Sequence, residues 1–248
     1  MKKVELVPLL GIPKVEPNDN ISLLILEALK RKKINLCSND VIVIAHKIVS
    51  IAENRFVDIG SIIPKRKAIS LSKKTNVSPE MCQLIIENSK KVIKYKKNLI
   101  ISENNLGIIT ANAGIDGSNI KDKKSVVLLP VNPNKSAMKI AHGINANSKR
   151  NIGIIISDSI GRPWRYGLTQ ISIGSYGVLP IKKYKKDLYG RSLNETEVPI
   201  TDELASAAGL LMEKDIGVPV VLIRGYNYKK SKKDSNILLR SDKNDIFR

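Results

Sequence analysis

The stretch that decides the fold is Ile152-Gly153-Ile154-Ile155-Ile156-Ser157-Asp158-Ser159-Ile160-Gly161-Arg162-Pro163-Trp164-Arg165, an apolar run that gives way to polar residues. Residues 152–156 are almost all isoleucine, and such a run predicts a strand of a buried sheet. Asp158 and Ser159 follow it, at the place where α/β proteins often bind ligands. Their oxygen atoms are hard ligands suited to Mg²⁺ or Mn²⁺.

Two arginines flank the only tryptophan just beyond these oxygen ligands. Arg162 and Arg165 could bind a phosphate or a carboxylate in forked geometry, because a guanidinium presents paired N–H donors. The alternative is an ordinary strand and turn held by structural salt bridges. Trp164 makes that alternative less favourable, although a single tryptophan more often packs than recognises a ligand.

A second polar segment reads Ala111-Asn112-Ala113-Gly114-Ile115-Asp116-Gly117-Ser118-Asn119 and follows another expected strand. Its small residues allow the backbone to approach a ligand closely, while Asp116 and Asn119 offer oxygen atoms. A surface turn is the alternative, since asparagine, glycine and aspartate are turn formers. Together the two acidic segments indicate phosphoryl-transfer chemistry supported by metal.

Helical and strand patterns alternate over the rest of the chain. Apolar residues recur at helical spacing from Ile21 to Leu29, with Asn20 as an N-cap, and Ser78 caps a helix that starts with Pro79. Gly143 is expected to end another helix. The sequence therefore predicts a mixed α and β protein with a sheet core. The expected helices cover residues 21–29, 78–93, 136–142 and 201–212, and the expected strands cover 41–45, 98–102, 107–110, 126–129, 152–156 and 220–223.

Several classes of function lack their sequence signatures. There is neither a Gly-x4-Gly-Lys-Ser/Thr sequence nor a Gly-x-Gly-x-x-Gly after a strand, which excludes a P-loop and disfavours a Rossmann site. Cys37 and Cys82 are too few for a disulfide framework, and His46 and His142 do not suggest a zinc site. No apolar run reaches the length of a membrane span, so we expect a cytoplasmic protein without a membrane partner.

The net charge of +19 is the most unusual bulk property of the chain. Basic stripes attract phosphate backbones, so a basic nucleic-acid-associated protein is an alternative function. The lysine clusters are scattered along the whole chain, however, and aromatic residues, which stack on bases, make up only 4% of it. We therefore expect a general attraction for anionic small molecules rather than a nucleic acid partner.

At these residues the sequence resembles the coenzyme F420:L-glutamate ligase family, also called F420-0:gamma-glutamyl ligase. The resemblance covers nearly the whole chain, and although each short motif is weak, the ordered set is highly specific. The motifs are Gly11-Ile12-Pro13, Lys47-Ile48-Val49-Ser50 with Ala52-Glu53, residues 111–116 with Ser118-Asn119, Leu128-Leu129-Pro130, Ser157-Asp158-Ser159, Gly161-Arg162-Pro163-Trp164-Arg165, Tyr189-Gly190-Arg191, Asp202-Glu203-Leu204-Ala205, Val218-Pro219 and Arg224-Gly225.

The resemblance implies a GTP-dependent ligase of coenzyme F420 biosynthesis. In such proteins GTP phosphorylates a carboxylate of the deazaflavin precursor F420-0, the amine of L-glutamate attacks the acyl phosphate, and a second glutamate can follow through a γ-linkage. Similar proteins use two Mg²⁺ or Mn²⁺ ions, with K⁺ as a further candidate, and form an intertwined homodimer. The implied fold is a two-lobed α+β fold, neither P-loop nor Rossmann. Residues 1–248 would form one catalytic region of two interleaved lobes, without a C-terminal oxidoreductase-like extension.

The resemblance also implies roles for individual residues. Asp116 and Asp158 would ligate one metal ion, Ser159 would ligate a second, and Glu213 is a further candidate ligand. Arg162 would act with the two aspartates in catalysis. The nucleotide site would be lined by Gly11, Ile12, Pro13, Lys14, His46, Lys47, Asn119, Met212, Lys214, Asp215 and Gly217.

The chain departs from the family pattern at the edge of this site. Ile51 stands where the family has a lysine, and the loop Met212-Glu213-Lys214-Asp215 lacks the usual glycines. Asn132 and Asn134 replace common aspartates in another segment. A degenerate relative that binds GTP without turnover is therefore an alternative, although both central aspartates remain.

Overall fold

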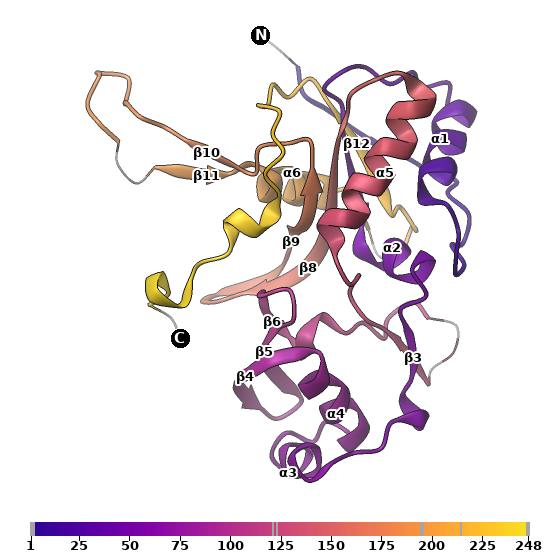
Figure 1. Cartoon of the computed structure of the whole chain (residues 1–248), viewed down its shortest axis with the longest axis vertical. Coiled ribbons are helices and arrows are strands. Elements are labelled where there is room, and N and C mark those ends of the chain that lie inside the picture. Colours follow the sequence, from indigo (N-terminus) through magenta and orange to yellow (C-terminus); the bar gives the residue numbers. More distant parts are fainter. Residues whose placement is uncertain (1–2, 121, 123, 194–195, 214, 247–248) are drawn as a thin grey trace.

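A five-stranded mixed sheet forms the centre of the molecule (Figure 1) in the computed structural model, which describes residues 3–120, 122, 124–193, 196–213 and 215–246. β2 and β8 run parallel, whereas the other neighbouring strands run antiparallel. The expected mixed α and β fold with a sheet core is thus confirmed. In spatial order the strands are β1 (Glu5–Pro8), β12 (Val220–Arg224), β2 (Val41–Ala45), β8 (Gly153–Arg162) and β9 (Arg165–Tyr176).

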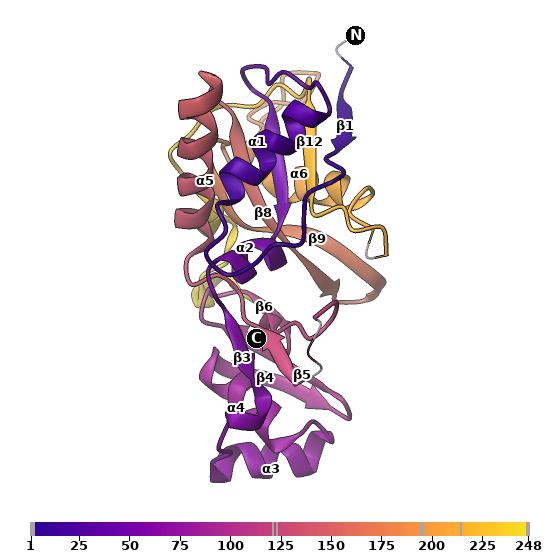
Figure 2. The ribbon, with the colours of Figure 1, turned by 90° about the vertical axis from the view of Figure 1, so that its right-hand side faces the viewer.

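Helices cover both faces of this sheet, as Figure 2 shows. Alternate side chains of one strand serve opposite faces, because Ile154 and Ile156 join one core while Ile155 joins the other. A strand between two helical layers has no solvent-facing side, which explains why residues 154–156 are all apolar. The first face carries α1 (Ile21–Arg31), α5 (Pro133–Ser148) and α2 (His46–Ala52), and the second carries α6 (Ile200–Gly209).

A smaller group of elements lies at one end of the central sheet, in the lower part of Figure 1. It has its own buried core, in which Cys82 and Ile85 meet Ile100 and Leu71. Its elements are β3 (Phe56–Asp58), which pairs with β7 (Ser125–Val127), the helices α3 (Arg66–Thr75) and α4 (Pro79–Glu87), and a three-stranded sheet of β4 (Ser89–Lys96), β5 (Leu99–Asn104) and β6 (Ile109–Ala111).

A narrow ribbon and several short 3-10 helices complete the fold. The ribbon pairs β10 (Ile181–Lys183) with β11 (Glu197–Pro199) and projects away from the central sheet (Figure 1). The 3-10 helices are η1 (Ile59–Ser61), η2 (Asn112–Gly114), η3 (Ser235–Leu238) and η4 (Asp242–Asn244).

The predicted helix over residues 78–93 is wrong in its second half. α4 ends at Glu87, and residues 89–96 form β4, which pairs antiparallel with β5. Two lysines, two apolar residues and then Lys94-Tyr95-Lys96 follow Ser89, a mixed pattern that suits a half-exposed strand as well as a helix surface. Pairing with β5 decides between them, because it satisfies the backbone N–H and C=O groups of the segment.

Two further elements are longer than predicted. The helix expected over residues 136–142 is α5, and Gly143 lies inside it instead of ending it. A Cβ at Gly143 would lie 2.5 Å from Ser22 Oγ, so this glycine permits a close approach of α5 to α1. The strand expected over residues 152–156 continues to Arg162, which places Asp158 inside a strand rather than in a loop.

The two predicted helix caps, Asn20 and Ser78, are confirmed. Asn20 Oδ1 accepts hydrogen bonds from the backbone N–H groups of Ser22 and Leu23, and Ser78 Oγ accepts one from the N–H of Met81. Among the described residues, no helix combines the length and the apolar character that crossing a membrane would require.

Candidate active site

A cavity of about 640 Å³ lies where the central sheet meets the smaller group of elements. Its wall combines segments far apart in the sequence, namely residues 12–15, the junction of β2 and α2, residues 110–119, the β8–β9 pair, residues 212–213 and residues 217–219. The sheet topology explains this meeting, because β2 and β8 are parallel and end at the same edge. The predicted site residues in the wall are Ile12, Pro13, Lys14, His46, Lys47, Asp116, Asn119, Asp158, Ser159, Met212, Glu213 and Gly217.

The other predicted site residues lie outside this wall. The backbone oxygen of Gly11 accepts a hydrogen bond from Arg31 Nη2, 2.6 Å away. Arg162 lies near the tip of the β8–β9 hairpin, where its Nη2 donates to the backbone oxygen of Tyr166 at 3.0 Å. Its role in catalysis stays a prediction. Asp215 is also absent from the wall, and Lys214 lies outside the described residues.

Buried His46 and partly buried Asp158 form a pair at the end of the parallel strands. Ala45 of β2 pairs with Ser157 of β8, so the residues that follow them lie side by side. His46 Nε2 lies 3.3 Å from Asp158 Oδ1, and His46 Nδ1 lies 3.4 Å from Ser50 Oγ. With Nε2 protonated, the ring donates to the carboxylate and accepts from Ser50, so His46 orients Asp158.

Asp116 is held by the start of α2 and by its own loop. Lys47 Nζ lies 2.7 Å from Asp116 Oδ2, while both the N–H and the hydroxyl of Ser118 donate to Oδ1 at 2.7 Å. Lys47 also donates to the backbone oxygen of Ser118. Burial raises the pKa of Asp116, but the hydrogen bonds from Lys47 and Ser118 outweigh it and hold this pKa below its ordinary value.

A left-handed turn brings Asp116 to the cavity. Asn112, Ala113 and Gly114 have φ angles of +49°, +58° and +76°, a region that residues with a side chain rarely adopt. A Cβ at Gly114 would lie 2.7 Å from Leu129 Cδ1, so only glycine fits there without displacing Leu129. After the turn, the backbone of Asp116 exchanges two hydrogen bonds with that of Val127, which fixes the carboxylate against the smaller group of elements.

Irregular strand pairing sets the direction of the side chains beyond Asp158. The register of β8 with β9 shifts between Ile156 and Ser157, and it shifts again near the hairpin tip. As a result Ser159 pairs with Gln170, whose Nε2 donates to Ser159 Oγ at 2.7 Å. Sequence reasoning missed Gln170 because a regular hairpin closed by Pro163 and Trp164 would place a different residue opposite Ser159.

Oxygen atoms of the kind that Mg²⁺ and Mn²⁺ prefer surround the cavity. The three hydrogen bonds to Asp116 use three of the roughly four acceptor positions of a carboxylate, which leaves one on Oδ2. His46 contacts one oxygen of Asp158. No group of three or more His, Cys, Asp and Glu side chains among the described residues could hold a metal ion by itself. A cation would therefore also need hydroxyl, water or substrate oxygens, which Mg²⁺ usually retains.

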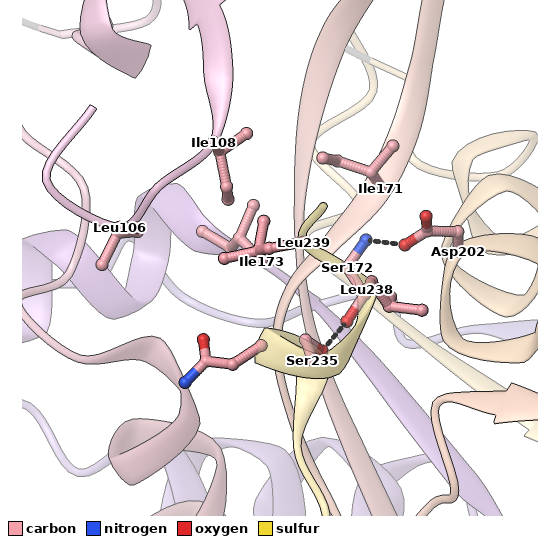
Figure 3. Close-up of a pocket in the computed structure, with 10 residues that line it drawn as sticks. Leu106, Ile108, Ile171, Ser172, Ile173, Asp202, Ser235, Leu238 and Leu239 are labelled. Atoms are coloured by element: carbon pink, nitrogen blue, oxygen red, sulfur yellow. Dashed lines mark hydrogen bonds between the residues drawn. The ribbon is translucent and has the colours of Figure 1, made fainter. Parts of the chain in front are cut away.

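A second, smaller cavity of about 100 Å³ lies on the other side of β9 (Figure 3). It is bounded by Leu106 and Ile108, by β9, and by the segment that contains η3. The hydroxyls of Ser172 and Ser235 lie 2.6 Å apart, and the N–H of Ser172 donates to Asp202 Oδ1 at 2.9 Å. These contacts hold β9 between α6 and the C-terminal segment. Burial raises the pKa of Asp202, although the hydrogen bond from Ser172 opposes this shift.

The chain matches a family of ligases. A family model described as F420-0:Gamma-glutamyl ligase matches residues 10–225, which include every segment of the cavity wall, and the chain belongs to this family. Among its relatives is coenzyme F420:L-glutamate ligase of Methanocaldococcus jannaschii, which is 44% identical over 212 residues, or 84% of each chain. The proteins of the same name from Methanothermobacter thermautotrophicus and Methanopyrus kandleri are 39% and 34% identical and match 99% of this chain, over 99% and 97% of their own lengths. The resemblance inferred from the motifs is therefore confirmed.

Proposed function

We propose that this protein joins L-glutamate to the deazaflavin precursor F420-0 at the expense of GTP, as a step of coenzyme F420 biosynthesis. The observation that carries the proposal is the meeting of Asp116, Asp158, Ser159 and Lys47 in one cavity, in a chain of this family. Relatives that match nearly the whole chain are named coenzyme F420:L-glutamate ligase.

The proposed reaction has two steps. A carboxylate oxygen of F420-0 attacks the γ-phosphorus of GTP, which releases GDP and gives an acyl phosphate. The amine of L-glutamate then attacks the acyl carbon, the carbon–nitrogen bond forms, and phosphate leaves while the amine loses a proton. A second glutamate could be joined through its γ-linkage in the same way.

Charged side chains of the cavity suit these anionic substrates. Lys14 and Lys47 both lie in the wall, and ammonium groups attract polyphosphates and carboxylates. His46 keeps Asp158 oriented, and Ser118 keeps Asp116 oriented, so neither carboxylate has to be ordered when the substrates arrive. The cavity volume of about 640 Å³ falls within the range of small-molecule sites, roughly 300–1,000 Å³.

Divalent cations are part of the proposal. Asp116, Asp158 and Ser159 would hold Mg²⁺ or Mn²⁺, with Glu213 as a further ligand and K⁺ as an additional ion. When bound, such ions neutralise the charge of the phosphates and align the reacting oxygens.

Product mass tests the proposed activity directly. The purified protein is incubated with F420-0, GTP, L-glutamate and Mn²⁺, and the products are analysed by mass spectrometry. We expect F420-0 to become heavier by one or two glutamyl residues, with one GDP formed for each. Omission of GTP is the control. Folded protein that forms no heavier product would refute the activity.

The second candidate function is GTP binding without turnover. It is favoured by Ile51, an apolar residue of the cavity wall at a position where a lysine could contact a phosphate. The same incubation separates the two functions, because a non-catalytic relative would bind GTP in a calorimetric titration yet release no GDP.

We also propose a homodimer. Large side chains on two projecting hairpins are exposed in the single chain, with Tyr166 fully exposed, Trp164 at 82%, and Leu188 and Tyr189 on the β10–β11 ribbon at 101% and 85%. Exposed aromatic and aliphatic groups on one chain are typical of surfaces that another chain covers.

A further inference from the structure

Gln170 of β9 lies in the wall of the large cavity and has no part in the chemistry described above. It stands opposite Ser159 in the strand register, and its Nε2 donates to Ser159 Oγ at 2.7 Å. The contact depends on the register shift between Ile156 and Ser157, where β9 has Ile173 as an extra residue. One extra residue moves every side chain between it and the hairpin tip to the opposite face of the sheet. The shift therefore turns Gln170 toward Ser159.

One face of α6 holds Gln170 in this position. Asp202, Ser206 and Gly209 follow one another at helical spacing and contact β9 in turn. Ser206 Oγ donates to the backbone oxygen of Gln170 at 2.7 Å. A Cβ at Gly209 would lie 2.6 Å from Gln170 Cγ, so the helix touches the side chain closely.

The amide of Gln170 is not explained by packing. Its Oε1 is buried and makes no hydrogen bond within the described part of the chain. An unpaired buried acceptor costs folding free energy, and an apolar side chain of the same length would avoid that cost. Groups retained at such a cost are often found at functional sites.

The hydrogen bond from Gln170 occupies one acceptor position of the Ser159 hydroxyl and so limits the contacts that the hydroxyl can make. A serine hydroxyl has two lone pairs and one hydrogen. With one lone pair engaged by Gln170 Nε2, the other can be given to a cation, while the hydrogen can be donated to an anionic oxygen. Residues that bind a metal ligand in this way orient it and usually alter the affinity for the metal.

We propose that Gln170 is a positioning residue that directs the Ser159 hydroxyl toward a divalent cation in the cavity. This inference rests on the metal ligands of the proposed function, with Ser159 among them. It adds a role for Gln170, for the register shift and for the face of α6 that holds both.

Binding of Mn²⁺ alone tests the inference without catalysis. Free Mn²⁺ is measured by electron paramagnetic resonance during titration of the wild type, Gln170→Met, Ser159→Ala and the double variant. We expect Gln170→Met to weaken the Mn²⁺ binding that depends on Ser159 by about 10-fold. The double variant should bind Mn²⁺ no more weakly than Ser159→Ala, because Gln170 acts through Ser159.

A matched control comes from the same strand. Ser175→Ala removes a buried hydroxyl that accepts a hydrogen bond from Ser235 Oγ at 2.9 Å, and it should leave Mn²⁺ binding at the wild-type level. If Gln170→Met does not fold, Gln170→Asn replaces it, since its amide is one methylene too short to reach Ser159.

Three results would overturn the inference: wild-type Mn²⁺ affinity in the Gln170 variant, no effect of Ser159→Ala, or independent losses that add in the double variant. The outcome is separable from that of the proposed function. Coupled Mn²⁺ binding without a glutamyl product would refute the activity alone, whereas product formation with uncoupled binding would refute the role of Gln170 alone.

Discussion

Asp158 contacts His46 and is also a proposed metal ligand. One substitution separates these two roles. Asparagine at position 158 can still accept the hydrogen bond from His46 Nε2, but it carries no charge for a cation. We expect Asp158→Asn to lower the rate of glutamyl transfer by on the order of 100-fold or more, while the melting temperature stays close to that of the wild type. An unchanged rate in Mn²⁺ would show that Asp158 is not a ligand.

Gly114 is the residue at which the left-handed turn should be least tolerant of change. Alanine there would combine a φ of +76° with a Cβ 2.7 Å from Leu129 Cδ1. We expect Gly114→Ala to lower the free energy of unfolding by about 1–3 kcal/mol, measured by urea denaturation. Gly161→Ala is the matched control, because a Cβ at Gly161 meets nothing within 4 Å, and its effect should stay within about 0.5 kcal/mol.

For individual residues, the sequence predicts candidates that belong to a motif, and it misses candidates whose position depends on strand pairing. Asp116, Asp158 and Ser159 are recognisable from their type and from the strands before them. Gln170 is not, because its position opposite Ser159 depends on pairing irregularities that no local pattern reveals. Nor does the sequence show the left-handed turn at Ala113, since alanine rarely adopts a positive φ.

The contact between α6 and β9, made by Asp202, predicts that folding stability depends on pH. The pKa of Asp202 is raised by burial, so between its ordinary value near 4 and its raised value the folded protein binds more protons than the unfolded chain. Stability that depends on Asp202 must therefore fall as the pH rises through this range. Asp202→Asn removes the titration, and its amide oxygen can still accept from the N–H of Ser172.

We therefore expect the stability of the wild type relative to Asp202→Asn to decrease from pH 4 to pH 7. Urea denaturation of both proteins at the two pH values measures this difference. A relative stability that rises with pH would show that the charged carboxylate is favoured in the folded protein.

Elements with a cap or a continuous apolar run are predicted well, and elements decided by distant partners are not. Asn20 marks the start of α1 because the cap is local. β4 was predicted as the end of a helix, since only its pairing with β5 makes residues 89–96 a strand. Gly143 was predicted as a helix end, whereas its close contact with Ser22 of α1 is a tertiary feature.

For the whole molecule, the sequence indicates a sheet core but not the order of its strands. The order places β12 between β1 and β2, so the last strand of the described chain lies beside the first, which forms one edge of the sheet. Nothing local encodes such an arrangement. The predicted division of residues 1–248 into two interleaved lobes stays a prediction.

The proposed homodimer gives a prediction at this scale. Replacing Tyr166 and Leu188 by serine removes two exposed hydrophobic groups from the projecting hairpins, and the mass measured by light scattering should fall from that of two chains to that of one. Ile63→Ser is the control, because Ile63 is 84% exposed but lies outside both hairpins. A wild type with the mass of one chain would contradict the proposal.

The parallel pairing of β2 with β8 has a consequence for how the chain folds. Val41 pairs with Gly153, so the two strands can meet only after a very long loop has closed, and the entropy of that closure is lost before any contact compensates for it. Proteins rich in such distant contacts fold slowly. His46 and Asp158 meet at the end of this pair, so in refolding experiments the recovery of the proposed Mn²⁺ binding should lag behind the recovery of helical signal.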